Sequence, residues 1–302
     1  MDNIEESFGR GGNKKKPKST TLLDQFGEDL TQMAAEGKLD AIIGREKEVH
    51  RICQILSRRK KNNPIILGDP GVGKTALVEA IAQRIIDKKV ARTLFNKRII
   101  SLNINNIVAG TKYRGEFEER MKNIVEELKD NTDIILFIDE IHTLVGAGGA
   151  GGSLDASNIL KPALARGQVQ CIGATTLDEY RENIESDGAL TRRFQEVFID
   201  PPSCEDTVEI LKRIKDKYEE HHAVVYTEDA LYACVNLSER YITQRELPDK
   251  AIDVMDEAGA KIHMQEIKVP EFVKKLEKEV DDARVAKVEA VTKQDYEQAA
   301  FY

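Results

Sequence analysis

A glycine-rich octapeptide constrains the fold of this chain more than any other feature of its sequence. Residues 68–75 read Gly-Asp-Pro-Gly-Val-Gly-Lys-Thr and match the pattern G-x-x-x-x-G-K-[ST]. They follow the apolar run Ile65–Leu67 and precede a segment with helical character, Lys74–Asp87. Glycines here let successive backbone N–H groups turn toward one anion, and the positive end of the helix dipole adds to that attraction. The sequence therefore predicts a phosphate-binding loop, against the alternative of a chance glycine-rich turn.

The residues of this loop carry distinct predicted roles. We expect Lys74 to reach the terminal phosphates of a nucleotide, and we expect the Thr75 hydroxyl to bind Mg²⁺. The nucleotide-binding residues predicted in the loop are Gly68, Asp69, Pro70, Gly71, Val72, Gly73, Lys74 and Thr75.

A second acidic element follows another apolar run. Ile134–Ile138 ends directly in Asp139 and Glu140, which is the arrangement known as a Walker B motif. We expect Asp139 to order Mg²⁺ through its water shell, because Mg²⁺ in proteins keeps several waters. Glu140 is the predicted base that orients or deprotonates the attacking water, and this extra carboxylate favours an ATPase over a GTPase switch. The alternative is a strand followed by a solvated turn.

Five short apolar runs alternate with helical segments between residues 42 and 199. Uninterrupted apolar strands that alternate with helices are buried on both faces, so they predict an α/β fold with a parallel five-stranded sheet between helices. One further helix is expected over Thr21–Gly37, ahead of the sheet. The five runs are Ile65–Leu67, Ile99–Leu102, Ile134–Ile138, Val169–Gly173 and Val197–Ile199.

The composition and the helix and strand signals change along the chain, and they predict a division into four segments. Residues 1–20 are polar and lysine-rich, which is typical of a flexible linker, with a nuclear-import or nucleic-acid patch as the alternative. Residues 21–202 form the α/β domain, and 203–268 form a small helical domain because strand signals vanish there. After Pro270, residues 269–302 resemble the start of a helical hairpin or coiled coil, and we expect the sequence to be truncated at its C-terminus.

The composition of the chain limits the classes of function that it can have. A net charge of −8 over 302 residues lowers the expectation of a nucleic-acid partner, because such proteins present a basic face. No apolar run approaches the ~20 residues of a membrane span, and no secretory signal is visible. The four scattered cysteines indicate reduced, mostly buried thiols in a cytoplasmic protein. None of the five histidines has metal-site spacing, so Mg²⁺ is the only metal that we expect.

Six strings around these motifs resemble the first AAA+ module of the Clp ATPases, closest to the ClpC and ClpB type. The resemblance covers roughly residues 22–265 and implies an AAA+ P-loop NTPase fold with a helical lid, followed by the start of a middle domain. A proline usual in this family is replaced by Ala41, which is expected to loosen the adenine-side segment slightly. The strings begin at Gly44, Ala109, Phe137, Gly173, Ala189 and Leu247.

The resemblance also implies roles for residues outside the two motifs. Thr176 matches sensor 1, a polar group at a strand end that contacts the attacking water or the γ-phosphate. Arg192 and Arg193 match the arginine fingers, which act on ATP held by a neighbouring subunit; a solvated surface pair is the alternative. The residues that match the adenine pocket are Ile42, Ile43, Leu247 and Pro248, the last two in a segment that also holds Lys250.

Two loops match the pore loops of Clp unfoldases. Lys112, Tyr113 and Arg114 match the loop that grips a translocating polypeptide, where an aromatic side chain gives apolar contact with any sequence. Residues 146–151 fit the dinucleotide pattern G-x-G-x-x-G literally but do not directly follow a strand, so we interpret 146–153 as a second pore loop.

The expected function is therefore an ATP-binding and ATP-hydrolysing module of a hexameric Clp-type unfoldase that threads polypeptides. A ClpP-type peptidase and adaptors are expected to bind only through an N-terminal domain, a complete middle domain and a second ATPase module that this sequence lacks. Two alternatives remain open: a nucleotide-binding assembly or regulatory module with little hydrolysis, and an AAA+ motor acting on nucleic acid.

Overall fold

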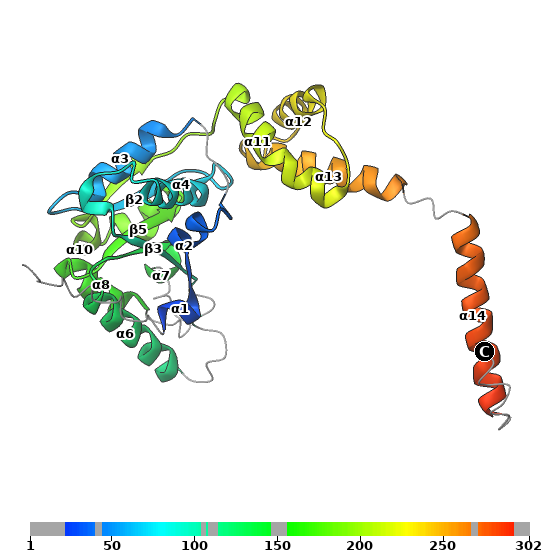
Figure 1. Cartoon of the computed structure of the whole chain (residues 1–302). Coiled ribbons are helices and arrows are strands. Elements are labelled where there is room, and N and C mark those ends of the chain that lie inside the picture. The colour runs from blue at the N-terminus through cyan, green and yellow to red at the C-terminus, as the bar shows by residue number, and fades with distance from the viewer. Residues whose placement is uncertain are drawn as a thin grey trace, which may run out of the picture.

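A mixed six-stranded sheet organises most of the chain, and three further helices pack beside it (Figure 1). The computed structural model describes residues 22–39, 44–103, 107, 114–145, 156–266 and 271–292. We call the part from helix α1 to strand β6 the large domain, and helices α11 to α13 the helical domain.

Five strands of the large domain are parallel, in the spatial order β3-β4-β5-β2-β6. The side chains of β2 and β4, and nearly all of those of β5, are buried on both sheet faces, which explains their uninterrupted apolar runs, whereas Glu196 and Phe198 of β6 are exposed. In β4, for example, Leu136 belongs to one core and Phe137 to the other. The strands are β2 (Asn63–Leu67), β3 (Arg98–Leu102), β4 (Ile134–Ile138), β5 (Gln170–Thr175) and β6 (Phe194–Phe198).

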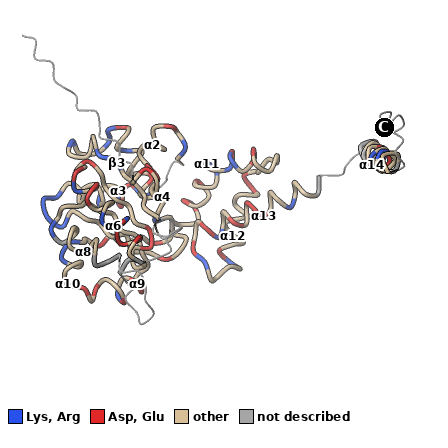
Figure 2. Tube along the Cα trace, turned by 90° about the horizontal axis from the view of Figure 1, so that it is seen from below, with Lys and Arg blue, Asp and Glu red and all other residues tan. Residues whose placement is uncertain are grey.

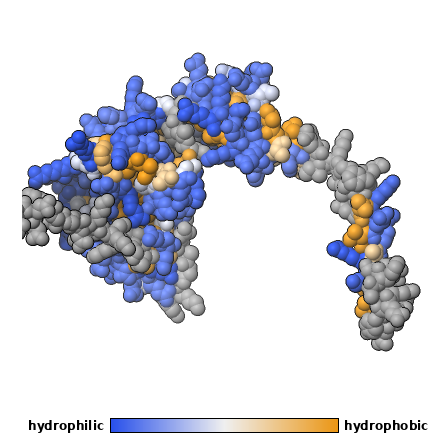
Figure 3. Space-filling view, in the orientation of Figure 1, coloured by the Kyte–Doolittle hydropathy of each residue, from blue (hydrophilic) through white to orange (hydrophobic). Residues whose placement is uncertain are grey.

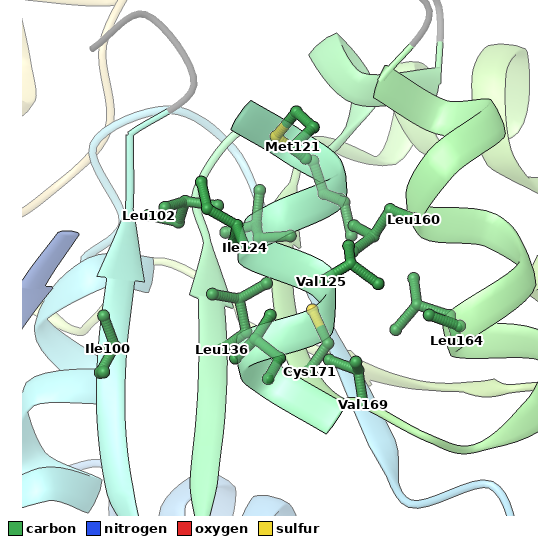
Figure 4. Close-up of a cluster of buried hydrophobic side chains, with 14 of the residues drawn as sticks. Ile100, Leu102, Met121, Ile124, Val125, Leu136, Leu160, Leu164, Val169 and Cys171 are labelled. Atoms are coloured by element: carbon green, nitrogen blue, oxygen red, sulfur yellow. The ribbon is translucent and has the colours of Figure 1, made fainter. Parts of the chain in front are cut away.

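Helices cover both faces of this sheet. On one face, α6 and α8 pack on β3, β4 and β5 through residues such as Ile124, Leu136 and Leu160 (Figure 4). On the other face, α3 and α4 bury apolar side chains against β2 and its neighbours. These helices are α3 (Glu46–Leu56), α4 (Lys74–Ile86), α6 (Arg114–Asp130) and α8 (Ala156–Arg166), with short turns at η1 (Arg92–Leu94), α7 (His142–Val145), α9 (Leu177–Tyr180), η3 (Arg181–Glu185) and α10 (Gly188–Thr191).

The single helix expected over residues 21–37 is wrong. The chain forms α1 (Leu23–Phe26), then strand β1 (Gly27–Asp29), then α2 (Leu30–Ala35). Strand β1 pairs antiparallel with β3 and adds a sixth strand to the five expected. A Cβ on Gly27 would lie 2.7 Å from Ile100 Cγ2, so only glycine allows this close approach. Edge pairing and the Asp29 cap, which accepts from Gln32 N at 3.0 Å, therefore override the local helical preference.

The helical domain has a core of its own. Its helices are α11 (Cys204–His222), α12 (Glu228–Tyr241) and α13 (Asp249–Glu266), and they pack around Leu211, Leu231 and Met255. Ser203 and Thr227 cap the first two through hydroxyls that accept backbone N–H bonds.

Helix α14 (Glu271–Thr292) lies apart from the helical domain in Figure 1. Leu276, Val280 and Val288 are more than half exposed, and Figure 3 shows hydrophobic surface along this helix. All four cysteines are free thiols, and three of them are buried, as the sequence predicts.

Candidate nucleotide site

The strand order brings the predicted motifs to one edge of the sheet. Strand β5 lies between β2 and β4, and all three run in the same direction. Their carboxyl ends carry the phosphate loop (β2), the Asp139–Glu140 pair (β4) and Thr175 (β5). Ligands of open α/β sheets bind in the crevice outside such strand ends, so the topology itself assembles the site.

The phosphate loop has the backbone that its glycines permit. Gly71 and Gly73 adopt φ of +82° and +91°, values that other residues rarely reach. The Lys74 ammonium donates to the carbonyl oxygens of Gly68 at 3.0 Å and Asp69 at 2.9 Å. Lys74 is therefore held over the loop, at the N-terminus of α4, where an anion is favoured.

Burial lowers the pKa of the Lys74 ammonium because a desolvated charge is disfavoured. The carboxylates of Asp139, Asp69 and Glu140 act in the opposite direction and favour the charged form. The site thus combines a partly buried lysine with nearby carboxylates.

The two predicted metal ligands lie in direct contact. The Thr75 hydroxyl donates to Asp139 Oδ2 at 2.7 Å, and Asp139 Oδ1 accepts the backbone N–H of Glu140 at 3.0 Å. Glu140 has a left-handed backbone with φ +49°, which directs the chain away from the strand at this point. A hydroxyl and a carboxylate at this separation form a donor set that suits Mg²⁺.

Two threonines end strand β5 beside this pair. The buried Thr175 has its hydroxyl 2.8 Å from His142 Nδ1. The Thr176 hydroxyl accepts the backbone N–H of Glu179 at 3.3 Å and so caps α9. Both threonines line the same cavity as the phosphate loop, and Thr176 was the one predicted from the sequence.

A cavity of about 850 Å³ opens over these strand ends. Its floor is formed by the phosphate loop from Pro70 to Thr75, together with Asp139 and Glu140. The opposite wall comes from the helical domain, which contributes apolar and aromatic side chains suited to a flat base. These wall residues are Ile210, Ile214, Tyr218, Pro248, Asp249 and Ile252.

The helical domain meets the phosphate loop at Asp249. A Cβ on Gly71 would lie 2.7 Å from the Asp249 Cβ, so the first residue of α13 packs directly against the loop. Lys250, the next residue, points elsewhere: its ammonium is buried and bonds Glu239 at 2.6 Å and the Ile242 carbonyl at 3.2 Å. Leu247 is buried in the core of the helical domain and does not line the cavity, whereas Pro248 does.

Arg45 also lines the cavity, although sequence reasoning gave it no role. Its guanidinium donates to the carbonyl oxygens of Val72 at 3.3 Å and Asp200 at 2.6 Å. Val72 belongs to the phosphate loop, and Asp200 follows β6 just before the helical domain. The two residues whose carbonyl oxygens Arg45 contacts lie 27 and 155 residues away along the chain. No local sequence pattern could therefore indicate its role.

We expect Arg45→Met to weaken binding of a fluorescent ATP analogue by about tenfold, because two bonds from a charged donor are lost and each contributes about 1 kcal/mol or more. Titration of the purified variant by fluorescence anisotropy measures this. Arg51→Met, on the same helix but exposed and bonded only to Gln54 among the described residues, is the matched control and should bind like the parent. Equal affinities in the two variants would contradict the positioning role of Arg45.

The predicted arginine fingers lie away from this cavity. Arg192 is exposed and Arg193 is partly buried, and both directly precede β6. Neither lines the cavity, so the described part of the chain does not bring them to its own phosphate loop. Ile42, Ile43, Lys112 and Tyr113 lie outside the described residues, as does the glycine-rich segment 146–153, while Arg114 begins helix α6.

Two family models match neighbouring parts of the sequence, and residues of both parts line this cavity. Residues 64–201 match the AAA model, the ATPase family associated with various cellular activities, and residues 203–302 match an AAA lid domain. Over 97% of its length the chain is 56% identical to the chaperone protein ClpB of Oceanobacillus iheyensis. It is 53% identical over 98% of its length to the ATP-dependent Clp protease ATP-binding subunit ClpC of Staphylococcus epidermidis. The chain belongs to the Clp-type AAA ATPases.

Solved structures agree with this assignment. The Clp-type chain is 46% identical to one in the S. cerevisiae Hsp104–ADP complex, with a TM-score of 0.75 over 80% of this chain and 42% of that one. It is 45% identical, again with a TM-score of 0.75, to one in a closed-state Hsp104 complex with ATPγS and FITC casein, covering 82% of this chain and 42% of that one. The resemblance to ClpC and ClpB is thus confirmed, and this Clp-type chain spans 36% of the length of both curated relatives.

Two features are absent from the described residues of this Clp-type chain. No helix there is long and apolar enough to cross a membrane. No group of three or more His, Cys, Asp or Glu side chains could hold a metal ion within the same residues.

Proposed function

We propose that this chain binds and hydrolyses ATP as one AAA module of a Clp-type chaperone that threads polypeptides through a hexameric ring. The observation that carries the proposal is the cavity in which the phosphate loop, the Thr75–Asp139 pair and Glu140 meet at adjacent strand ends. The phosphate loop on one side of the cavity can bind the phosphates of ATP, and the helical domain on the other side offers apolar side chains to the adenine base.

Thr75 and Asp139 would hold Mg²⁺ together with the nucleotide phosphates. When bound, the ion neutralises charge that develops on the phosphate oxygens. The contact of 2.7 Å between the hydroxyl and the carboxylate supports this assignment, because both oxygens already face one point.

The remaining chemistry belongs to side chains of this chain. Lys74 neutralises the terminal phosphates, and Glu140 accepts a proton from the water that attacks the terminal phosphorus. The bond from the water oxygen to phosphorus forms as the bridging bond to the β-phosphate breaks, which leaves ADP and phosphate. Thr176, at the end of β5, lies on the cavity wall between the two motifs and would orient the water.

Arg192 and Arg193 would complete the cavity of a neighbouring copy. They lie outside their own cavity, so a role in hydrolysis requires a second chain. The contribution of such a finger is about 10³–10⁵ in rate where it has been measured in GTPases. Self-association into a ring therefore follows from the same proposal.

Polypeptide is the proposed substrate of the ring. One similar structure is an Hsp104 complex with casein, and the resemblance assigns the gripping loop to Lys112, Tyr113 and Arg114. The ClpC relatives are named as subunits of a Clp protease, so the full protein would feed a ClpP-type peptidase or act as a disaggregase. The free thiols suit a reducing compartment, and we place the protein in the cytoplasm.

Fluorescein-labelled casein tests the substrate class. With ATPγS, the parent chain should raise the anisotropy of the casein, and Tyr113→Ala should weaken that binding by roughly tenfold or more while ATP binding is unchanged, because the apolar contact is lost. Tyr241→Ala, an exposed aromatic on α12, is the control and should bind casein like the parent. Unchanged casein binding in Tyr113→Ala would remove that loop from the proposal, and no binding by the parent would favour a regulatory module instead.

A further inference from the structure

A tight turn carries Asp139 and Glu140 past the end of strand β4. The paired ladder between β4 and β5 extends to Ile138, just before the two carboxylates. Directly after them, the backbone N–H of Ile141 donates to the Ala174 carbonyl of β5 at 3.0 Å. The turn that displays both carboxylates is therefore attached to β5 at its beginning and at its end.

His142 follows this turn and extends the attachment through its side chain. Its Nδ1 lies 2.8 Å from the Thr175 hydroxyl of β5, and its Nε2 lies 3.9 Å from Glu179 Oε2 of α9. A carboxylate is better matched by an N–H than by a lone pair, so this arrangement favours the proton on Nε2. Nδ1 then accepts the bond that the Thr175 hydroxyl donates. The imidazole thus bridges β5 and α9, and Figure 2 shows α9 on the side of the large domain that also carries α8 and α10.

Thr175 connects the parts of the site on which hydrolysis depends. It is only 1% exposed, and its carbonyl oxygen accepts the N–H of Gly68, the first residue of the phosphate loop, at 3.3 Å. Its hydroxyl meets His142, and the next residue along the chain is Thr176, which lines the cavity. A buried hydroxyl that loses its partner is costly, so the contact with His142 favours one arrangement of the turn and the strand end.

We propose that His142 is a positioning residue for ATP hydrolysis, because its bond to Thr175 holds the turn that carries Glu140 in register with Thr176. The proposal rests on the proposed function, in which Glu140 is the base and Thr176 orients the attacking water. These two residues follow different strands, so a fixed separation between them needs a connection across the sheet edge. The His142–Thr175 pair supplies one at the cavity itself, since both members line it. Misplacement of reacting groups by about 1 Å can cost about 10²-fold in rate.

The same geometry disfavours His142 as the base itself. Both ring nitrogens face side chains of this chain, Thr175 at 2.8 Å and Glu179 at 3.9 Å. Glu179 in turn accepts a bond from the Asn183 amide at 3.0 Å, which holds its carboxylate in place. An imidazole engaged in this way is suited to holding the turn, whereas a base must face the water whose proton it takes.

Three substitutions of His142 test the proposal in the full 302-residue chain. His142→Ala should lower the single-turnover rate of ATP hydrolysis by roughly 10–100-fold, because Glu140 and Thr176 lose their fixed separation. His142→Asn should bring the rate back to within about threefold of the parent, because an Asn amide lies as far from Cβ as Nδ1 and can still accept from Thr175. His142→Gln extends its amide to the position of Nε2 instead and should remain slow. The affinity for a fluorescent ATP analogue should be the same in the parent and in all three variants.

The partner side of the bond is tested by Thr175→Val, which keeps the shape of the side chain and removes the hydroxyl. This variant should lose as much rate as His142→Ala, and the double variant should lose no more than either, since both remove the same contact. His50→Ala is the control: this exposed histidine lies on α3, apart from α9 in Figure 2, and its loss should leave the rate unchanged. Thermal unfolding of every variant reports whether the fold is kept.

The remaining outcomes overturn the inference in separate ways. If His142→Asn is as slow as His142→Ala and both unfold at the temperature of the parent, the bond to Thr175 has no positioning role. If Gln restores the rate and Asn does not, the contact with Glu179 is the one that matters. A parallel fall in rate, affinity and unfolding temperature in all three variants would indicate a purely structural residue. A parent that does not hydrolyse ATP in a single turnover would overturn the proposed function together with the inference.

Discussion

Replacement of Glu140 by Gln is expected to lower the ATPase rate by roughly 10²–10⁴ while ATP binding is retained. The amide keeps the shape of the side chain but cannot accept a proton from water. The backbone at this position, with φ +49° and the N–H bonded to Asp139, makes no use of the carboxylate, so the loop should keep its geometry. The variant should therefore retain unhydrolysed ATP through gel filtration.

Single-turnover hydrolysis of labelled ATP measures the chemical step directly. Asp139→Asn is the contrasting variant, because it removes the negative charge beside the Thr75 hydroxyl and should weaken Mg²⁺-dependent nucleotide binding as well as the rate. A Glu140→Gln chain that turns over ATP like the parent would remove Glu140 from the role of base. A chain that fails to bind ATP would show instead that the carboxylate supports the loop.

Arg193→Ala is expected to lower the ATPase rate by about 10³–10⁵, the range measured for arginine fingers. Arg193 does not line the cavity of its own chain, and in the proposed function it acts on a nucleotide held by another chain. The specific activity of the parent should accordingly rise with protein concentration, and that of Arg193→Ala should stay low throughout. Arg192→Ala, one residue away, is the matched comparison that shows which arginine dominates.

Mixing two inactive variants tests whether Arg193 acts on the nucleotide of another chain or on that of its own chain. Glu140→Gln keeps its arginines, and Arg193→Ala keeps its base. In a mixed assembly, the first variant can supply Arg193 to an intact Glu140 in the second, so activity should reappear on mixing. Activity that remains at the level of the separate variants would place the effect of Arg193 within its own chain.

Much of the nucleotide site could be predicted because its signals are local. The residues 68–75 and the pair Asp139–Glu140 each come directly after a run of apolar residues, and parallel strands place their C-terminal neighbours at one edge of the sheet. The alternation of strands and helices likewise predicted the five parallel strands. In both cases the chemistry and the spacing lie within a few residues of each other.

The remaining features depend on contacts between distant segments. Strand β1 forms because β3 is available at an edge, and nothing in residues 27–29 alone indicates a strand. The cavity wall formed by Ile210, Ile214 and Tyr218 depends on how the helical domain meets the sheet, and these residues read as ordinary helical core in the sequence. Arg45 is similar, since its two carbonyl partners are brought close only by the fold.

The contact between Gly71 and Asp249 has a mechanical consequence. The absence of a side chain at Gly71 is what allows α13 to rest on the phosphate loop, since even a methyl group would approach Asp249 to 2.7 Å. Gly71 thus determines how near the helical domain can lie to the phosphate loop, in addition to shaping an anion cradle. Any residue larger than glycine there would push α13 and the phosphate loop apart, so the fit between the two domains depends on the absence of one carbon atom.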